Sequence, residues 1–230
     1  MELIEHIPMP PQSLANIEIG ITKFLSMACP EHLLFPESLD IQMLNYILWN
    51  KLGYKEFMVD NFDDPDMEAM TDFSHKVIYL PKDKYYKDLK EGKPRCKFTL
   101  AHETGHIILH ADYVVNILQV AARNSMTTKY REPKIFEKAE WQANTAAGAL
   151  LMPLTTLWPL IRKCQLQGYT TNDIIEVIQD EYDVSKGSAS IRLENVMKSN
   201  LDFMKAIIEK NNPACITGTS RISPSVLTKR

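Results

Sequence analysis

The chain has 230 residues, of which 45% are hydrophobic and 24% charged, so it can fold around a sizeable core. Its formal net charge of −3 argues against a general polyanion binder, so contact with nucleic acid would need a local basic patch. The four cysteines lie far apart without a CxxC pair, which is typical of reduced thiols and predicts a cytoplasmic protein. We expect neither a signal peptide nor a membrane span.

The first part of the chain is predicted to form two helices and then a small sheet. Apolar residues at helical spacing predict a helix over residues 12–26. A second helix is expected from the N-cap candidate Ser38 to Gly53, a residue type that readily takes the left-handed conformation. Two strand-like runs follow at residues 55–60 and 75–81, separated by an acidic loop. We expect these runs to pair as a small antiparallel sheet.

The remainder is predicted to be almost entirely helical. The expected helices span residues 95–110, 135–152, 154–164 and, as a pair of short helices, 171–198. Pro153 ends the second of them because proline cannot continue a helix. The polar tail from residue 211 is expected to be disordered. The predicted fold class is therefore α+β and mostly helical, with a small antiparallel sheet and a C-terminal helical appendage.

The stretch "FTLAHETGHIILH", residues 98–110, holds three of the six histidines. On a helix, His102 and His106 of this HExxH pattern lie on one face, one turn apart, which suits two ligands of one divalent ion. Glu103 can reach a metal-bound water without binding the metal itself. Zinc would lower the pKa of that water towards about 7, and Glu103 can accept and return the proton. The pattern therefore predicts a hydrolase.

A third ligand must come from elsewhere in the chain. His110 is excluded in a regular helix because about 12 Å of axial rise separates it from His102, so we expect it behind a ligand or in a structural role. The next predicted helix offers Glu137 and Glu140. Glu140 is favoured because Asn144 lies one turn further on the same face, where its amide can orient a ligand histidine. Glu137 is expected to be a solvated acid at a helix start.

Small residues predict that these two helices pack closely. A glycine inside a helix costs about 1 kcal/mol relative to alanine, so Gly105 needs a structural reason. The helix that carries Glu140 is rich in small residues, namely Ala143, Ala146, Ala147, Gly148 and Ala149, so another helix can approach it closely. We expect Gly105 to lie against it.

The segment between the two helices, residues 111–135, is long for a connection. It is interpreted either as a lid or binding loop or as an additional helix over residues 113–122. Hydrolysis of a peptide commonly needs a side chain that stabilises the oxyanion. Tyr130, Tyr113 and His110 are the candidates, and the sequence does not choose among them.

The runs "FTLAHETGHIILH" and "EWQANTAAGALLMP" together closely resemble the two signatures of the ImmA/IrrE metallopeptidases, which typically read "RFTLAHELGHLLLH" and "EREANRFAAELLMP". The resemblance covers residues 53–153. It implies a zincin-like domain in which His102, His106 and Glu140 bind one Zn2+ per chain, with Mn2+ as an alternative, and Glu103 is the catalytic acid and base.

The chain departs from this family pattern at a few places. Thr104 replaces an apolar residue, Gln142 replaces an acid, Ala146 stands where phenylalanine is common, and the segment over residues 111–135 is longer than expected. None of these changes removes a proposed ligand. The expected domains are a metallopeptidase domain over residues 1–165, a helix-turn-helix-like segment packed on it over 166–210, and a tail over 211–230.

The pair of short helices has the outline of a helix-turn-helix, with Ser185 as the candidate N-cap of the second helix. Its first helix is rich in acids that repel phosphates, and its second offers only Lys186, Arg192 and Lys198 as basic residues, so packing is favoured over DNA contact. The family resemblance implies a protein substrate, typically a helix-turn-helix repressor whose cleavage releases a mobile element or a stress response. The alternatives are a non-catalytic regulator that binds a partner protein or DNA, and the toxin-like half of a two-gene module. The intact Glu103 argues against a purely structural metal site.

Overall fold

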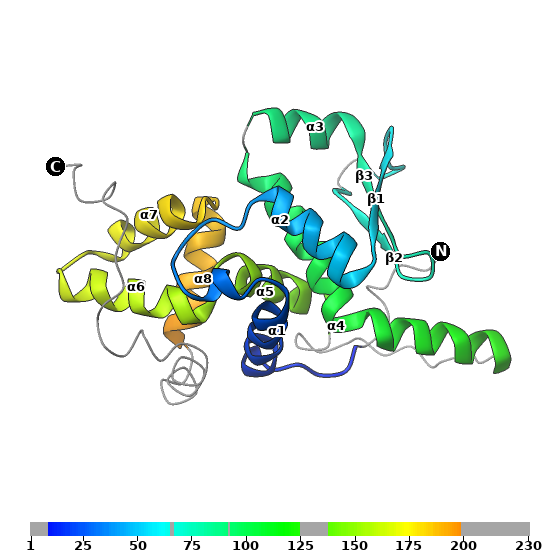
Figure 1. Cartoon of the computed structure of the whole chain (residues 1–230), viewed down its shortest axis with the longest axis horizontal. Helices are drawn as coiled ribbons and strands as arrows, with labels where there is room; N and C mark the ends of the chain where they lie inside the picture. The colour runs from blue at the N-terminus through cyan, green and yellow to red at the C-terminus, as the bar shows by residue number, and fades with distance from the viewer. Residues whose placement is uncertain (1–8, 65–66, 92, 125–137, 199–230) are drawn as a thin grey trace. The chain divides into compact units, whose positions relative to one another are not determined.

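The computed structural model describes residues 9–64, 67–91, 93–124 and 138–198 of the chain, which form helices and one small sheet (Figure 1). This confirms the α+β, mostly helical class. The chain divides into two compact units, one of Met1–Ile21 and Asp40–Leu150 and the other of Thr22–Leu39 and Leu151–Arg230. The domain boundaries at residues 165 and 210 stay a prediction, and the predicted tail lies outside the described residues.

Short helical segments precede the sheet: α1 (Leu14–Ala28), the 3-10 helix η2 (Pro30–Leu33), α2 (Ile41–Tyr46) and its π-helical continuation η3 (Ile47–Leu52). The predicted cap Ser38 was wrong, because Asp40 immediately precedes α2 and its carboxylate accepts a hydrogen bond from the Met43 amide at 2.7 Å. Gly53 ends η3 with a φ of 75°, as predicted for a residue without a Cβ.

The sheet consists of β1 (Lys55–Val59), β2 (Met70–Asp72) and β3 (Val77–Pro81), in the order β1-β3-β2. The prediction of an antiparallel sheet was only partly right, since β2 is antiparallel to β3 but β1 is parallel to it. The reason is β2, which lies in the predicted acidic loop. It forms a hairpin with β3, closed by Asp72, which accepts hydrogen bonds from the amides of Ser74 and His75. β1 then pairs with the other edge of β3 after a crossover.

Three further helices follow: α3 (Lys82–Lys90), which was not predicted, α4 (Pro94–Asn124) and α5 (Ala139–Leu151). Pro94 opens α4, in agreement with the preference of proline for the first helical position. α4 continues well past His110, so the additional helix predicted over residues 113–122 is its last part. Residues 125–137 lie outside the described residues.

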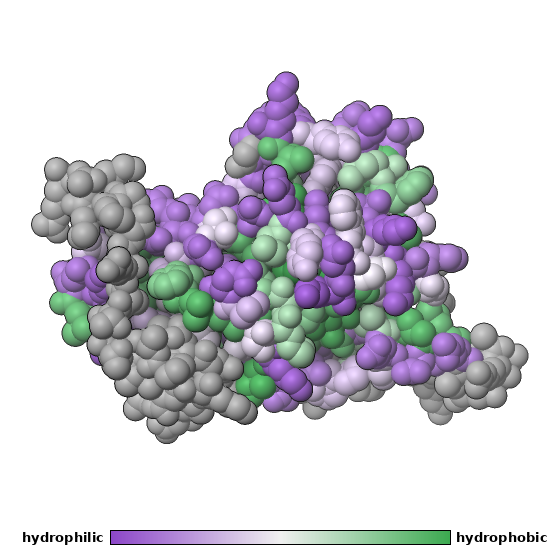
Figure 2. All heavy atoms as spheres, viewed as in Figure 1, coloured by the Kyte–Doolittle hydropathy of each residue, from purple (hydrophilic) through white to green (hydrophobic). Residues whose placement is uncertain are grey.

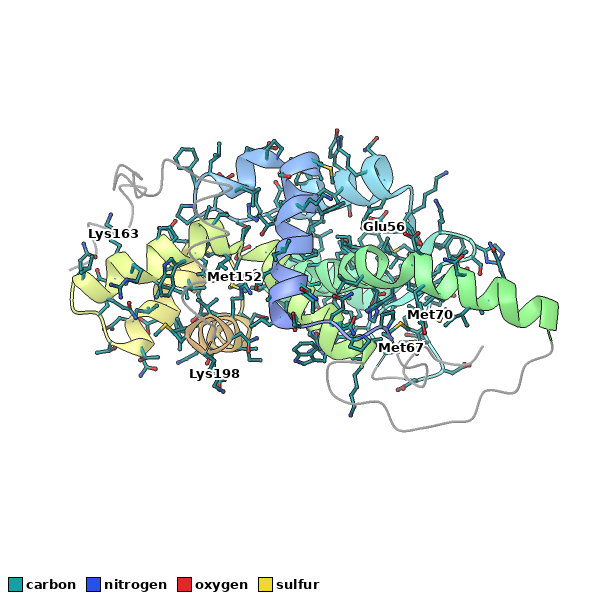
Figure 3. The ribbon with its side chains drawn as sticks, turned by 90° about the horizontal axis from the view of Figure 1, so that it is seen from below. Glu56, Met67, Met70, Met152, Lys163 and Lys198 are labelled. Carbon is teal, nitrogen blue, oxygen red and sulfur yellow. The ribbon has the colours of Figure 1, made fainter. Side chains whose placement is uncertain are left out.

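The long helix α4, drawn in green in Figure 1, is held by apolar packing within the first unit. Leu100, Ala101 and Ile107 are buried on it, and it contacts α2, α3 and β2. Figure 3 shows Met70 of β2 beside the ribbon of this helix. A helix that carries ligands must be held rigidly in this way to keep their geometry.

The second unit contains α6 (Leu154–Leu166), α7 (Thr171–Tyr182) and α8 (Lys186–Lys198). Ser185 accepts a hydrogen bond from the Ser188 amide at 3.1 Å and caps α8, as predicted. Arg192 is buried and donates through Nε and Nη2 to the carbonyl oxygen of Met152, at 3.1 and 2.9 Å. The guanidinium of Arg192 is therefore engaged inside this unit, which leaves Lys186 and Lys198 as the basic residues that α8 presents.

The described cysteines, Cys29, Cys96 and Cys164, are free and buried, as expected for reduced thiols. No helix in the described part of the chain combines the length and the apolar character needed to cross a membrane. On the face drawn in Figure 2, hydrophilic residues are intermixed with scattered hydrophobic ones.

Candidate metal centre

Three side chains from α4 and α5 converge on one point. The Nε2 atoms of His102 and His106 lie 3.0 Å apart, and the Glu140 carboxylate lies 3.1 Å from the first and 3.2 Å from the second. A tetrahedral zinc ion with bonds of about 2.0–2.1 Å holds its ligand atoms about 3.3 Å apart. Among the described residues, these three form the one cluster of histidine, cysteine, aspartate or glutamate side chains that could hold a metal ion. Two imidazoles and a carboxylate at this spacing fit a zinc ion.

Close packing of α5 on α4 produces this convergence. A Cβ on Gly105 would lie 3.0 Å from the Ala143 carbonyl oxygen and 3.0 Å from the Ala146 Cβ. These distances are tighter than nearly all real Cβ contacts, so Gly105 permits a close approach and a larger residue at position 105 would push α5 away by a few tenths of an ångström. The helical spacing of His102 and His106 sets one side of the centre, and this approach brings Glu140 to the other.

The outer nitrogens of the two histidines also have partners. Nδ1 of His102 lies 3.0 Å from Oδ1 of Asn144, the residue predicted to orient a ligand. Nδ1 of His106 lies 3.1 Å from Nδ1 of His110, whose Nε2 lies 2.9 Å from Oε1 of Gln142. His110 is thus one residue removed from the convergence point, as its position along the helix requires. Such outer contacts fix the ring orientation of histidine ligands.

The electrostatics of the centre favour an ionised carboxylate. Burial by itself raises the pKa of Glu140, but the adjacent imidazoles of His102 and His106 outweigh it and hold that pKa well below its usual value. Burial also opposes the charged form of His102, yet the hydrogen bond with Glu140 and the charge of Glu103 raise its pKa. Burial and the neighbouring His106 lower the pKa of His110 to about 4. An anionic oxygen beside two imidazoles matches the needs of a divalent cation.

Glu103 lies beside this group and is held by a residue that sequence reasoning missed. Its side chain is buried, with the residue 6% exposed, and its Oε2 accepts a hydrogen bond from the Thr71 hydroxyl of β2. Because 32 residues separate the two and no local pattern marks Thr71, only the packing of β2 on α4 could reveal this contact.

The segment before β2 is also tied to the start of α4. Glu68 accepts a hydrogen bond from the Thr99 hydroxyl at 3.0 Å and forms an ion pair with Arg95. These contacts hold the strand that carries Thr71 against the helix that carries Glu103.

The remaining predicted residues have different outcomes. Tyr130 and Glu137 lie outside the described residues. Tyr113 lies on α4 seven residues beyond His106, about 10 Å further along the helix axis, and its role at the oxyanion stays a prediction. Thr104, which departs from the family pattern, is fully buried and donates to the Leu100 carbonyl at 2.7 Å, so its hydroxyl is satisfied inside the helix.

Comparison with known proteins agrees with the resemblance seen in the sequence. The chain shows no significant match to a curated protein or to a solved structure. A family model, Peptidase_M78, described as the IrrE N-terminal-like domain, matches residues 71–194. The match begins at Thr71, includes His102, Glu103, His106 and Glu140, and extends through most of α8. Because it covers more than half of the chain, the protein belongs to the Peptidase_M78 family of IrrE N-terminal-like domains.

Proposed function

We propose that this protein is a zinc-dependent endopeptidase that cleaves a regulatory protein. The observation that carries the proposal is the convergence of His102, His106 and Glu140, whose ligand atoms all lie within 4.8 Å of one another, beside the buried carboxylate of Glu103. Two imidazoles and one carboxylate leave a fourth tetrahedral position for the reaction, which is the arrangement of a catalytic zinc site. A closed structural site would have no use for the adjacent acid.

When bound, zinc at this donor set supplies Lewis-acid polarisation and a lowered pKa for water. The chain itself supplies the proton transfers. Glu103 is the general base that takes the proton of the attacking water and the general acid that returns it to the leaving amine. The Thr71 hydroxyl holds Oε2 of Glu103, which leaves Oε1 to carry the proton. Asn144 of α5 holds the ring of His102 of α4, so this contact also links the two ligand-bearing helices.

The substrate class in this proposal comes from the family resemblance. A helix-turn-helix repressor is the expected substrate, and hydrolysis of one of its peptide bonds would end the repression of the genes that it controls. The burial of Arg192 favours packing over DNA contact as the role of α7 and α8, because it removes one of the three basic residues of α8 from the surface.

Metal content tests this proposal directly. Elemental analysis of the purified protein is compared with that of His102→Ala, Glu140→Ala and Glu103→Gln. We expect about one zinc per chain in the wild type, strong loss in the first two variants and full retention in the third, since only the first two remove a ligand. The Glu103→Gln variant should then trap an uncut substrate protein.

Two outcomes would contradict the proposal. If the wild-type protein binds neither zinc nor manganese when either is supplied, the peptidase proposal fails. The protein would then be a binding protein with a peptidase-like fold. Equal loss of metal in all three variants would mean that Glu103 is a ligand or a structural residue and not the acid and base.

A further inference from the structure

We infer that Gln142 and His110 form a hydrogen-bonded relay that holds His106 in the one neutral form able to bind a metal through Nε2. The inference rests on the metal site of the proposed function and deepens it by assigning two positioning residues. An imidazole binds a metal only through a nitrogen without a proton, so a ligand histidine must carry its proton on the other nitrogen. The relay decides which nitrogen that is.

The backbone carbonyl of Pro10 determines the direction of the relay. A carbonyl oxygen can only accept, so the Gln142 atom that faces it at 3.1 Å is the amide nitrogen Nε2. The other end of the amide, Oε1, must then face His110, whose Nε2 lies 2.9 Å away. Since Oε1 can only accept, the proton of His110 lies on Nε2.

The same reasoning carries the proton assignment to the ligand. Neutral His110, protonated on Nε2, has a bare Nδ1, and this atom lies 3.1 Å from Nδ1 of His106. One of the two must donate, so His106 carries its proton on Nδ1. Its Nε2 is therefore bare and points at Glu140 and His102, where a metal would bind. Every hydrogen bond from the backbone to the ligand has one consistent direction.

Burial limits the access of water to the members of this relay. Gln142 is 0% exposed and His110 is 1% exposed, so water does not readily replace a lost partner. If the group at position 142 cannot accept, His110 is expected to move its proton to Nδ1 and donate to His106. His106 would then carry its proton on Nε2, in the position of the metal. Moving that proton away from Nε2 would cost free energy, so zinc would bind more weakly.

The relay also explains a departure from the family pattern. An acid at position 142 can accept from His110 but cannot donate to a carbonyl, whereas the amide of Gln142 does both. Gln142 thereby links the backbone of Pro10 to the ligand His106 through His110. His102 is oriented independently, by Asn144, so the two ligands can be perturbed separately.

The test measures the dissociation constant for zinc by competition with a chelating indicator, on the full-length protein. Gln142→Met keeps the size of the side chain but removes both hydrogen bonds, and zinc binding should weaken about 10–100-fold, the range seen when partners behind a ligand are removed. Gln142→Glu keeps the acceptor for His110 and should bind nearly as tightly as the wild type. Gln167→Met, at an exposed position after α6, is the matched control and should leave binding unchanged.

A second measurement does not depend on the folding of a variant. Nitrogen NMR of the imidazoles in the zinc-loaded wild type should show His110 protonated on Nε2 and bare on Nδ1. An imidazolium, or a proton on Nδ1, would overturn the relay.

The outcomes separate the relay from the proposed function. If the wild type binds zinc and Gln142→Met binds it as tightly, the relay is wrong and the peptidase proposal stands. If the wild type binds no zinc, the proposed function fails and the inference fails with it.

Discussion

At the scale of single residues, most polar side chains around the centre are held by a second residue. His102 is held by Asn144, His106 by His110, and Glu103 by Thr71. The first and third pairs each join two different elements, and His110 is tied to α5 through Gln142, so the reactive geometry depends on how those elements pack. Thr71 is the least obvious member, because it belongs to a three-residue strand with no sequence signature of function.

Replacing Thr71 should therefore show how much its hydrogen bond to Glu103 contributes to the stability of the protein. Thr71→Val keeps the shape but leaves a buried carboxylate without this donor, and we expect a loss of about 1–3 kcal/mol in the free energy of unfolding of the metal-free protein. Thr71→Ser restores the hydroxyl and should recover most of the loss. Chemical denaturation measures all three proteins.

The Glu103→Gln background provides the control. The effect of Thr71→Val should shrink there, because the charged acceptor is gone. An equal effect in both backgrounds would mean that Thr71 stabilises the strand and not Glu103.

At the scale of elements, the centre depends on how closely α5 approaches α4. Gly105 lies at the closest point, against the backbone of Ala143 and the methyl group of Ala146. The backbone oxygen of Ala143 cannot move away without moving α5, which carries Glu140. Helix spacing and ligand geometry are therefore coupled at this one glycine.

Gly105→Ala should separate the two helices. The gain in helix propensity of about 1 kcal/mol is opposed by an overpacking cost of about 1–3 kcal/mol, so we expect a net loss of stability. Zinc affinity should fall as well, because Glu140 moves away from the histidines. Thermal unfolding and competition with a chelating indicator report the two effects.

Gly20→Ala is the matched control on α1. A Cβ at Gly20 would meet no atom within 4 Å, so the variant should gain about 0.5–1 kcal/mol through helix propensity and leave zinc affinity unchanged. Gly105→Ala that behaved like this control would contradict the close-packing explanation.

At the scale of the whole molecule, the chain forms two compact units, and all three proposed ligands belong to the first. The family match runs from residue 71 to residue 194, so it includes helices of both units. A ligand that binds only the folded protein stabilises it in proportion to its free concentration. Metal is thus expected to be part of the stability of the first unit.

Removing the metal should lower the unfolding midpoint. Zinc at about 1,000 times its dissociation constant contributes about 4 kcal/mol, and a chelator should abolish this contribution. Hydrogen exchange should show the largest loss of protection in α4 around His106 and in α5 around Glu140. The His102→Ala variant should not respond to the chelator, and a response equal to that of the wild type would place the stabilising metal elsewhere.

Part of the fold could be read from local patterns. Gly53 was predicted as a left-handed helix end and Ser185 as a helix cap, because both act through their own backbone or through an amide a few residues away. β2 was missed because a strand of three residues has too little periodicity to be recognised. Its absence from the prediction also led to the wrong pairing of β1, since the partner of a strand is a property of the whole sheet.

The sequence by itself determined the pairing of His102 with His106 and the placement of Glu103 beside them, because an HExxH spacing acts through the geometry of a single helix. It also indicated Glu140 and Asn144, through spacing on a second helix. Small residues on both helices also predicted that they meet at Gly105, as the structure shows. The tertiary structure alone decided that Thr71 holds Glu103 and that Gln142 links Pro10 to His110. The physical reason is range, because a helix fixes neighbours within one or two turns, whereas contacts between distant segments arise only when their surfaces pack.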